Sequence, residues 1–431
     1  MADGHALIQS LEAIVEAQND HAQKVAQLNP ILLDPYNGDF GVFLLSLSTL
    51  PDDELCKVMK LVQFFEPAPL SLCRSSEISK VVAIFVNRHN PELSLQFLHY
   101  VELGVFGACT FKVPRESMDI LVDFAISCIP DESLALSEKA CEITYASVTV
   151  LHLSELIEIL FSYSQRHIDD SVLYLRFMAL LSRISAASED LFRSCETMGA
   201  VAAIVRLCTT DDILVQINAL ELLVDLASTA RGLEYMCSHR VINWLITASC
   251  GGWGEGENQI ETTGATAADP LISAQALRIL GSVFTKASKR SFDLLTRLDT
   301  SCVRHFLNTI NGYLVEGSEE QKVTGLVVLA DFAVISLSTL QLVIDSTGTG
   351  TSSASTNSSL LISWMDLLQS SKPELIAAVL HSVAKVLNQQ DTLFLPSAPG
   401  INSSPSDAGA GDAAIADGGA SGGGGGGGGG G

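Results

Sequence analysis

The chain of 431 residues lacks the short motifs by which catalytic sites are usually recognised. It contains no G-x-S-x-G turn, no phosphate-binding Walker loop, no H-E-x-x-H zinc motif and no dinucleotide-binding glycine fingerprint. Its nine histidines are dispersed. His99 or His152 could in principle act as a base, but a lone histidine on a helix is far more often structural or merely exposed. We therefore expect no enzymatic activity and no cofactor.

Metal-binding spacing and positive charge are also scarce. Ten cysteines occur without a C-x-x-C pair, so no metal site is predicted and the cysteines are expected to be free residues of the core. Lysine and arginine number 25 against 49 aspartates and glutamates, which gives a net charge of −24. We therefore expect neither nucleic acid nor an anionic membrane as a partner. A basic protein partner is compatible with this charge, and so is a simple role in solubility.

Signals for secretion or membrane insertion are missing as well. No charged-then-apolar leader opens the sequence. The apolar run at residues 326–344 contains Asp331, and a carboxylate at the centre of a bilayer costs about 3 kcal/mol. This run is predicted to be a buried helix. We expect a cytoplasmic protein, with the nucleus left open as a second location.

What the sequence does contain is a repeat. DDSVLYLRFMALLSRIS begins at Asp169, and DDILVQINALELLVDLAS begins forty-two positions later at Asp211. In each copy the apolar residues recur at every third position with further leucines between them, which is a helical stripe and not the alternation of a strand. Helical units of about forty residues are typical of armadillo and HEAT repeats, which stack to bury their apolar faces. The predicted fold is all-α, an armadillo/HEAT-like helical-repeat solenoid with a disordered C-terminal tail.

Composition divides the chain into three regions. Residues 1–128 are predicted to form N-terminal helical repeats or a cap, and 129–394 armadillo-like repeats with loop insertions near 251–269 and 346–359. Residues 395–431, rich in glycine, have nothing to bury and are predicted to be disordered. Each copy of the repeat opens with an apolar residue that the stripe assigns to the core: Leu134, Val172, Leu214 and Leu271.

Polar residues recur beside the buried stripe at spacings of three and four, so they share one face of each helix. Stacking would align them as parallel ladders, and on a concave surface these would form a groove for a protein partner. An ordinary solvated helix face is the alternative for any single position. The candidate protein-binding residues are Arg176, Arg183, Asn218, Glu221, Asp225, Gln275, Arg278, Ser282 and Asp331.

These repeats resemble armadillo repeats, whose last helix lines the concave groove. In the armadillo repeats of nuclear-import adaptors, a tryptophan and an asparagine occupy the places that Glu221 and Asp225 hold here. The absence of that pair counts against a receptor for basic import signals.

A closer resemblance lies in IPDESLALSEKACEI, in the segment from SVLYLRFMALLSRIS to MGAVAAIV, and in the segment from DDILVQINALELLVDLAS to HRVINWLI. Their order and spelling are similar to the family of 26S proteasome non-ATPase regulatory subunit 5, over about residues 125–335 and weakly in the N-terminal third. The two low-complexity insertions and the polyglycine tail depart from that family.

The resemblance implies a function without catalysis. Members of the family are ATP-independent chaperones for assembly of the proteasome regulatory particle base. They hold the C-terminal domain of one ATPase-ring subunit, together with associated base subunits, and leave before the particle is complete. A generic armadillo-repeat adaptor in trafficking or signalling is the alternative function.

Overall fold

The computed structural model describes residues 4–16, 45–62, 75–106, 115–250, 269–335 without 291 and 293, and a few short segments up to 372–394. Every regular element in these ranges is a helix. The predicted all-α helical-repeat solenoid is therefore confirmed. The predicted loop at 346–359 and the tail at 395–431 lie outside the described residues, as does the loop near 251–269 apart from Asp269.

The N-terminal part of the chain holds five α-helices and a short 3-10 helix within the described ranges. They are α1 (Gly4–Glu16), η2 (Leu47–Thr49), α4 (Asp52–Val62), α6 (Ser75–Arg88), α7 (Pro91–Phe106) and α8 (Arg115–Cys128). α1 is described only up to Glu16, because the residues that follow lie outside the described ranges. α4 begins directly after Pro51 with three acidic residues in its first turn, where negative charge favours the start of a helix through the helix dipole.

The central part repeats a unit of one long and two short helices. The first unit contains α11 (Ser171–Ala187), α12 (Glu189–Thr197) and α13 (Ala200–Leu207), and the second contains α14 (Ile213–Leu226), α15 (Ala230–Ser238) and α16 (Val241–Ser249). Before them lie α9 (Leu134–Thr149) and α10 (Leu156–Arg166). After them lie α17 (Pro270–Lys289), η3 (Leu295–Arg297), α18 (Thr300–Glu316), α19 (Glu319–Ala333), η4 (Leu367–Gln369) and α22 (Pro373–Phe394).

Equivalent residues begin the helices of the two central units. Asp170 accepts hydrogen bonds from two main-chain N–H groups of α11, and Asp212 does the same for α14, so the repeated Asp-Asp pairs are helix caps. Gly199, before α13, has a φ of +86°, and Arg240, before α16, has a φ of +56°. The same left-handed turn therefore recurs, although only one copy has the glycine that this backbone conformation favours.

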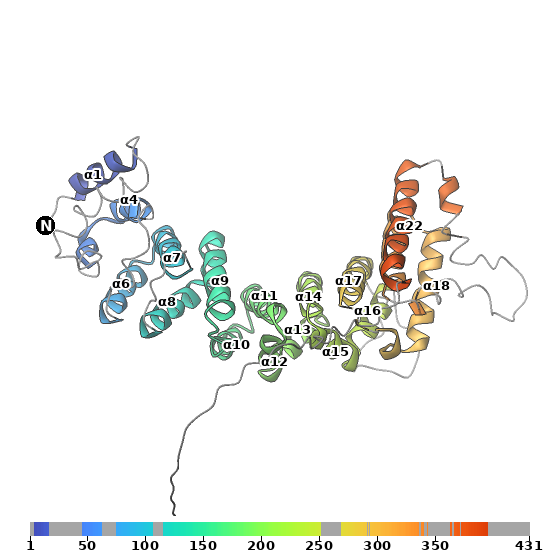
Figure 1. Cartoon of the computed structure of the whole chain (residues 1–431). Coiled ribbons are helices and arrows are strands. Elements are labelled where there is room, and N and C mark those ends of the chain that lie inside the picture. The colour runs from blue at the N-terminus through green and yellow to red at the C-terminus, as the bar shows by residue number, and fades with distance from the viewer. Residues whose placement is uncertain are drawn as a thin grey trace, which may run out of the picture.

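The helices form two rows along an elongated, bent array (Figure 1). Each long helix packs on the next in the order α4, α7, α9, α11, α14, α17, α19 and α22. Helices α8, α10, α12, α15 and α18 lie along the other side (Figure 1). Both ends of the array bend toward the side of the long helices, so this inner row faces the concave side (Figure 1). α8 packs directly on α9, so the helices stay in contact across residue 128.

A continuous apolar core runs between the two rows. It contains the predicted leucine stripes and, toward the C-terminus, three mutually packed aromatic rings from α17, α18 and α19: Phe284, Phe306 and Phe332. All cysteines in the described ranges are free, and Cys195 and Cys208 are buried in the core. None of the described helices is both long and apolar enough to span a membrane.

One part of the core prediction is wrong. The apolar residues in the first turns of α9, α11, α14 and α17 lie on the surface, although the stripe assigns them to the core. Their side chains are between 62% and 73% exposed: Leu134, Val172, Leu214 and Leu271. Each lies in the first turn of its helix, beyond the level at which the neighbouring helix packs. The buried stripe begins at later residues, such as Tyr174 in α11 and Val215 in α14.

Candidate functional site

The nine predicted binding residues lie on four consecutive helices of the inner row: α11, α14, α17 and α19. We call the side of the inner row that carries them the ladder face. Several of these side chains contact one another between neighbouring helices, as the sequence spacing implies. The contacts differ in kind from one pair of neighbouring helices to the next.

The step from α14 to α17 contains an exposed polar cluster. Glu221 on α14 accepts a hydrogen bond from Gln275 Nε2 at 3.1 Å and forms an ion pair with Arg278, both on α17. The side chains of Glu221 and Arg278 are 56% and 62% exposed. Exposed ion pairs of this kind contribute about 0–1 kcal/mol to stability, so the cluster remains available to a partner.

Between α11 and α14, a side-chain hydrogen bond connects the candidate residues to the neighbouring helix, and it involves Asp225. Asp225 on α14 is half-buried and accepts a hydrogen bond from Ser182 Oγ of α11 at 3.0 Å. Asn218 is exposed and donates to the carbonyl of Leu214 in its own helix. On α17, Ser282 likewise donates to its own helix, to the carbonyl of Arg278.

The step from α17 through α19 to α22 (the C-terminal end of the ladder) is closed. Asp331 is only 4% exposed, in contrast to the solvent-facing ladder position that its spacing suggested. Its Oδ1 accepts a hydrogen bond from Thr285 Oγ1 of α17 at 2.6 Å, and it forms an ion pair with Lys385 of α22. α17 approaches closely because Gly281 faces the Asp331 carboxylate. Asp331 thus joins three helices.

At the other end, two arginines of α11 face α9. Arg176 Nη1 donates to the main-chain carbonyls of Ile129 at 2.8 Å and Asp131 at 3.0 Å, in the turn that leads to α9. The Arg183 guanidinium lies over the ring of Tyr145 of α9, 5.0 Å from its centroid. In the described part of the chain, neither arginine forms an ion pair with a carboxylate.

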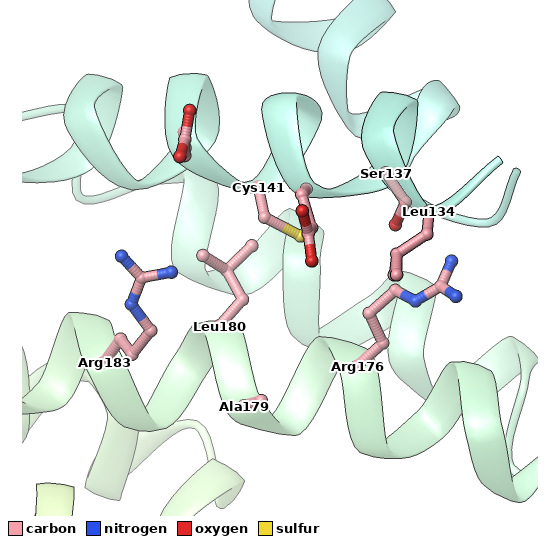
Figure 2. A pocket seen from close by; sticks show the side chains of 9 residues that line it. Leu134, Ser137, Cys141, Arg176, Ala179, Leu180 and Arg183 are labelled. Carbon is pink, nitrogen blue, oxygen red and sulfur yellow. The ribbon is translucent and has the colours of Figure 1, made fainter. Parts of the chain in front are cut away.

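A pocket of about 380 Å³ lies between these arginines, where α9 and α11 face each other. Figure 2 shows Arg176 and Arg183 at its two ends, with Ala179, Leu180 and Cys141 between them. Burial raises the pKa of the Cys141 thiol to about 11, although the two arginines act in the opposite direction. The thiol is therefore protonated at neutral pH and contributes a mainly apolar surface to the pocket.

The sequence prediction missed the apolar part of the ladder face. The exposed row of Leu134, Val172, Leu214 and Leu271, defined above, lies on the same helix face as the polar ladder residues. Val172, for example, precedes Arg176 by four positions and Ala179 by seven, which places all three on one face of α11. The sequence signal that could have revealed it is the position of Val172, Leu214 and Leu271, each two residues after a capping aspartate and so in the first turn of its helix.

The described residues include no group of three or more histidines, cysteines or carboxylates that could hold a metal ion. His99 is half-buried on α7, with its Nδ1 4.0 Å from Glu102, and burial lowers its pKa. These observations assign no chemistry to it. The inner row therefore presents a surface of mixed charge with an exposed apolar edge.

Fold and surface together define an armadillo-like helical-repeat protein. Residues 110–248 match the model of a family described as proteasome non-ATPase 26S subunit. The 26S proteasome non-ATPase regulatory subunit 5 of Bos taurus and that of Homo sapiens are each 30% identical to this chain over 126 residues. The family resemblance predicted from the repeats is therefore confirmed, and residues 110–248 are the segment that carries it.

This similarity is confined to part of each protein. The match covers 28% of this chain and 24% of each relative. In the sequence the likeness was expected over about 125–335, so the family match begins earlier and ends sooner. It spans α8 to α16 and thus includes the pocket and the ladder residues of α11 and α14.

Solved structures show weaker similarity. An engineered protein from a structural genomics consortium aligns with a TM-score of 0.40 at 11% identity, covering 90% of this chain and 99% of that protein. A designed armadillo repeat protein aligns with a TM-score of 0.33 at 10% identity, covering 88% of this chain and 99% of that protein. Both similarities are weak, and the assignment of the fold depends on the helices of this chain itself.

Proposed function

We propose that the protein is an ATP-independent assembly chaperone of the proteasome regulatory particle base. It binds the C-terminal domain of an ATPase-ring subunit, with associated base subunits, through the ladder face. The observation that supports this proposal most strongly is an overlap: the segment that matches the proteasome family contains two of the four ladder helices, α11 and α14, and the pocket between α9 and α11. We expect this activity in the cytoplasm, and the nucleus is a second place to look for it.

The physical character of the ladder face suits this task. A concave helical array encloses a domain from several sides and gains affinity from many modest contacts. Its exposed ion pair, its apolar row and the two arginines that form no ion pair among the described residues supply both charge complementarity and area to bury. Because such contacts require no nucleotide, the bound subunit would be released when the growing particle competes for the same surface.

Co-purification tests the proposal directly. The full chain, tagged and expressed in cells, should recover one ATPase-ring subunit and its base neighbours, but not the completed particle. Cells without the chain should accumulate incomplete base complexes on native gels. Capture of stable, non-proteasomal partners with no ATPase-ring subunit would contradict the proposal and favour the adaptor alternative.

A pair of charge swaps tests whether the ladder face carries the interaction. Exchanging Glu221→Arg and Arg278→Glu preserves the net charge and the internal ion pair but inverts the charges offered to a partner. The matched control exchanges Glu234→Arg and Arg297→Glu, an exposed ion pair between α15 and η3 in the other row. The ladder swap should reduce recovery of the ATPase-ring subunit about tenfold, and the control should leave it unchanged. Equal recovery from both variants would move the contact surface elsewhere.

A further inference from the structure

The pocket between α9 and α11 has walls of opposite charge. Arg176 and Arg183 stand on α11, and Glu138 and Glu142 stand on α9. Glu142 is paired with Lys139 of its own helix, at 2.7 Å. In the described part of the chain no ion pair crosses the pocket from these arginines to these glutamates, so the opposite charges are held apart over an apolar floor. A ligand with both acidic and basic groups could form ion pairs with the arginines of α11 and the glutamates of α9 at the same time.

The cationic wall of the pocket, Arg176 and Arg183, is held in place by contacts other than ion pairs. Arg176 is fixed by two main-chain carbonyls through Nη1, and Arg183 by the face of Tyr145. A guanidinium has five N–H donors, so donors remain on each arginine for a carboxylate. Although the protein has a net charge of −24, neither of these two arginines forms an ion pair with an acidic residue in the described part of the chain. Four arginines elsewhere on the array, Arg193, Arg231, Arg278 and Arg297, pair with an acidic residue, whereas the exposed Arg206 has no such pair among the described residues and lines no comparable pocket wall.

The spacing of the two arginines indicates the secondary structure of the ligand. They are seven residues apart on one helix, which corresponds to about 10.5 Å along its axis. A ligand helix lying along α11 repeats that distance between its positions i and i+7. In an extended ligand, same-face side chains are about 6.8 or 13.6 Å apart, and neither distance matches. The pocket floor lies midway, where such a helix would present its position i+3 or i+4.

We propose that this pocket anchors an amphipathic helix of the bound protein. An apolar side chain of that helix enters between Arg176 and Arg183, acidic side chains at i and i+7 bind the two arginines, and a basic side chain faces Glu138. The apolar anchor surrounded by charged contacts is the usual arrangement of an energetic hot spot. The identification of the bound protein as an ATPase-ring subunit rests on the proposed function; the chemistry of the helix rests on the pocket alone.

A synthetic helical peptide tests the chemistry without reference to the natural partner. The peptide carries glutamates at i and i+7, leucine at i+4 and lysines on the opposite side; its control has the same composition in scrambled order. The wild-type chain should bind the patterned peptide at least tenfold more tightly than the scrambled one. Arg183→Glu should abolish this preference. The matched control Arg206→Glu, an exposed arginine of α13 in the other row, should retain it.

A photoreactive amino acid at Ala179 tests the natural complex. Ala179 is half-buried between the two arginines, so a crosslinker there samples whatever occupies the pocket (Figure 2). We expect a crosslink to a helix of an ATPase-ring subunit that carries acidic residues seven positions apart. The same crosslinker at position 206 should give no such product. A crosslink to a segment without acidic residues would overturn the proposal.

The two proposals fail in different ways. If the wild-type chain captures no ATPase-ring subunit but prefers the patterned peptide, the proposed function is wrong and the pocket assignment stands. If the chain captures the subunit, and Arg183→Glu binds both the subunit and the peptide as the wild type does, the pocket assignment is wrong and the function stands. Circular dichroism of Arg183→Glu, expected to match the wild type, excludes misfolding as the cause of lost binding.

Discussion

The step from α9 to α11 and the C-terminal end of the ladder use equivalent helix positions in opposite ways. On α11, Arg183 faces a pocket and has no carboxylate partner among the described residues. On α19 the equivalent Asp331 is buried and bound by Thr285 and Lys385. The first step offers its charge to a ligand, and the second uses its charge to hold helices together.

This difference shows that position in a repeat does not decide the role of a side chain. The depth at which the neighbouring helix packs decides it. Gly281 lets α17 lie close against Asp331, whereas α9 leaves a pocket beside Arg183. A carboxylate that has been removed from water must be paired, so Asp331 is committed to the fold. An exposed guanidinium has no such requirement and can wait for a partner.

The largest expected effect concerns Cys141, which lines the pocket between α9 and α11. Because burial raises its pKa to about 11, its reactive thiolate form is rare at neutral pH and increases with pH. Alkylation of Cys141 by iodoacetamide should therefore accelerate about tenfold per pH unit between about pH 7.5 and 9.5, without levelling off. Mass spectrometry of timed samples separates Cys141 from the other thiols, and Cys208, fully buried, serves as the unreactive control. A plateau near the ordinary pKa of a thiol would contradict the buried pocket floor.

The next largest effect concerns Asp331, the buried carboxylate that joins α17, α19 and α22. Asp331→Ala removes two bonds to a charged acceptor and should lower the free energy of unfolding of the C-terminal helices by about 2–3 kcal/mol. Amide hydrogen exchange in α17 and α22 measures this loss locally, as is appropriate for a repeat array. The control is Glu221→Ala, an exposed ladder residue whose loss should cost about 1 kcal/mol or less. An equal loss in the free energy of unfolding for the two variants would contradict the inference that Asp331 stabilises the fold more than an exposed ladder residue does.

The contrast also marks what could be predicted from the sequence. The forty-two-residue repeat, its helices and the ladder contacts of Glu221 and Asp225 follow from the periodicity, because stacked equivalent helices bring equivalent positions together. The burial of Asp331 does not follow, since it depends on how closely α17 and α22 approach. The exposure of Val172 and Leu214 does not follow either, because an apolar stripe does not show where a neighbouring helix stops covering it.

The exposed apolar row predicts an effect on binding without one on stability. Val172→Ser with Leu214→Ser should change the free energy of unfolding by no more than about 0.5 kcal/mol per site, since both side chains are already in water. Affinity for the partner should fall about thirtyfold, because each of these two apolar side chains, when buried in a complex, contributes on the order of 1 kcal/mol. The control is Val150→Ser with Ile168→Ser, two exposed apolar positions that do not belong to the row. A loss of stability without a loss of affinity would show that these side chains support the fold and do not contact the partner.

The smallest effect is expected in the α14–α17 step, which tests where the open part of the ladder ends. Glu221 and Arg278 form an exposed ion pair, so a double-mutant cycle to alanine should give a coupling energy of about 1 kcal/mol or less. The coupling should weaken further in 1 M salt, where screening acts within about 3 Å. The same cycle on Glu234 and Arg297, an equally exposed pair outside the ladder, should give a similar value. A coupling above about 2 kcal/mol for the ladder pair alone would group this step with the closed end, because a strongly coupled pair is part of the scaffold and is not free to bind a partner.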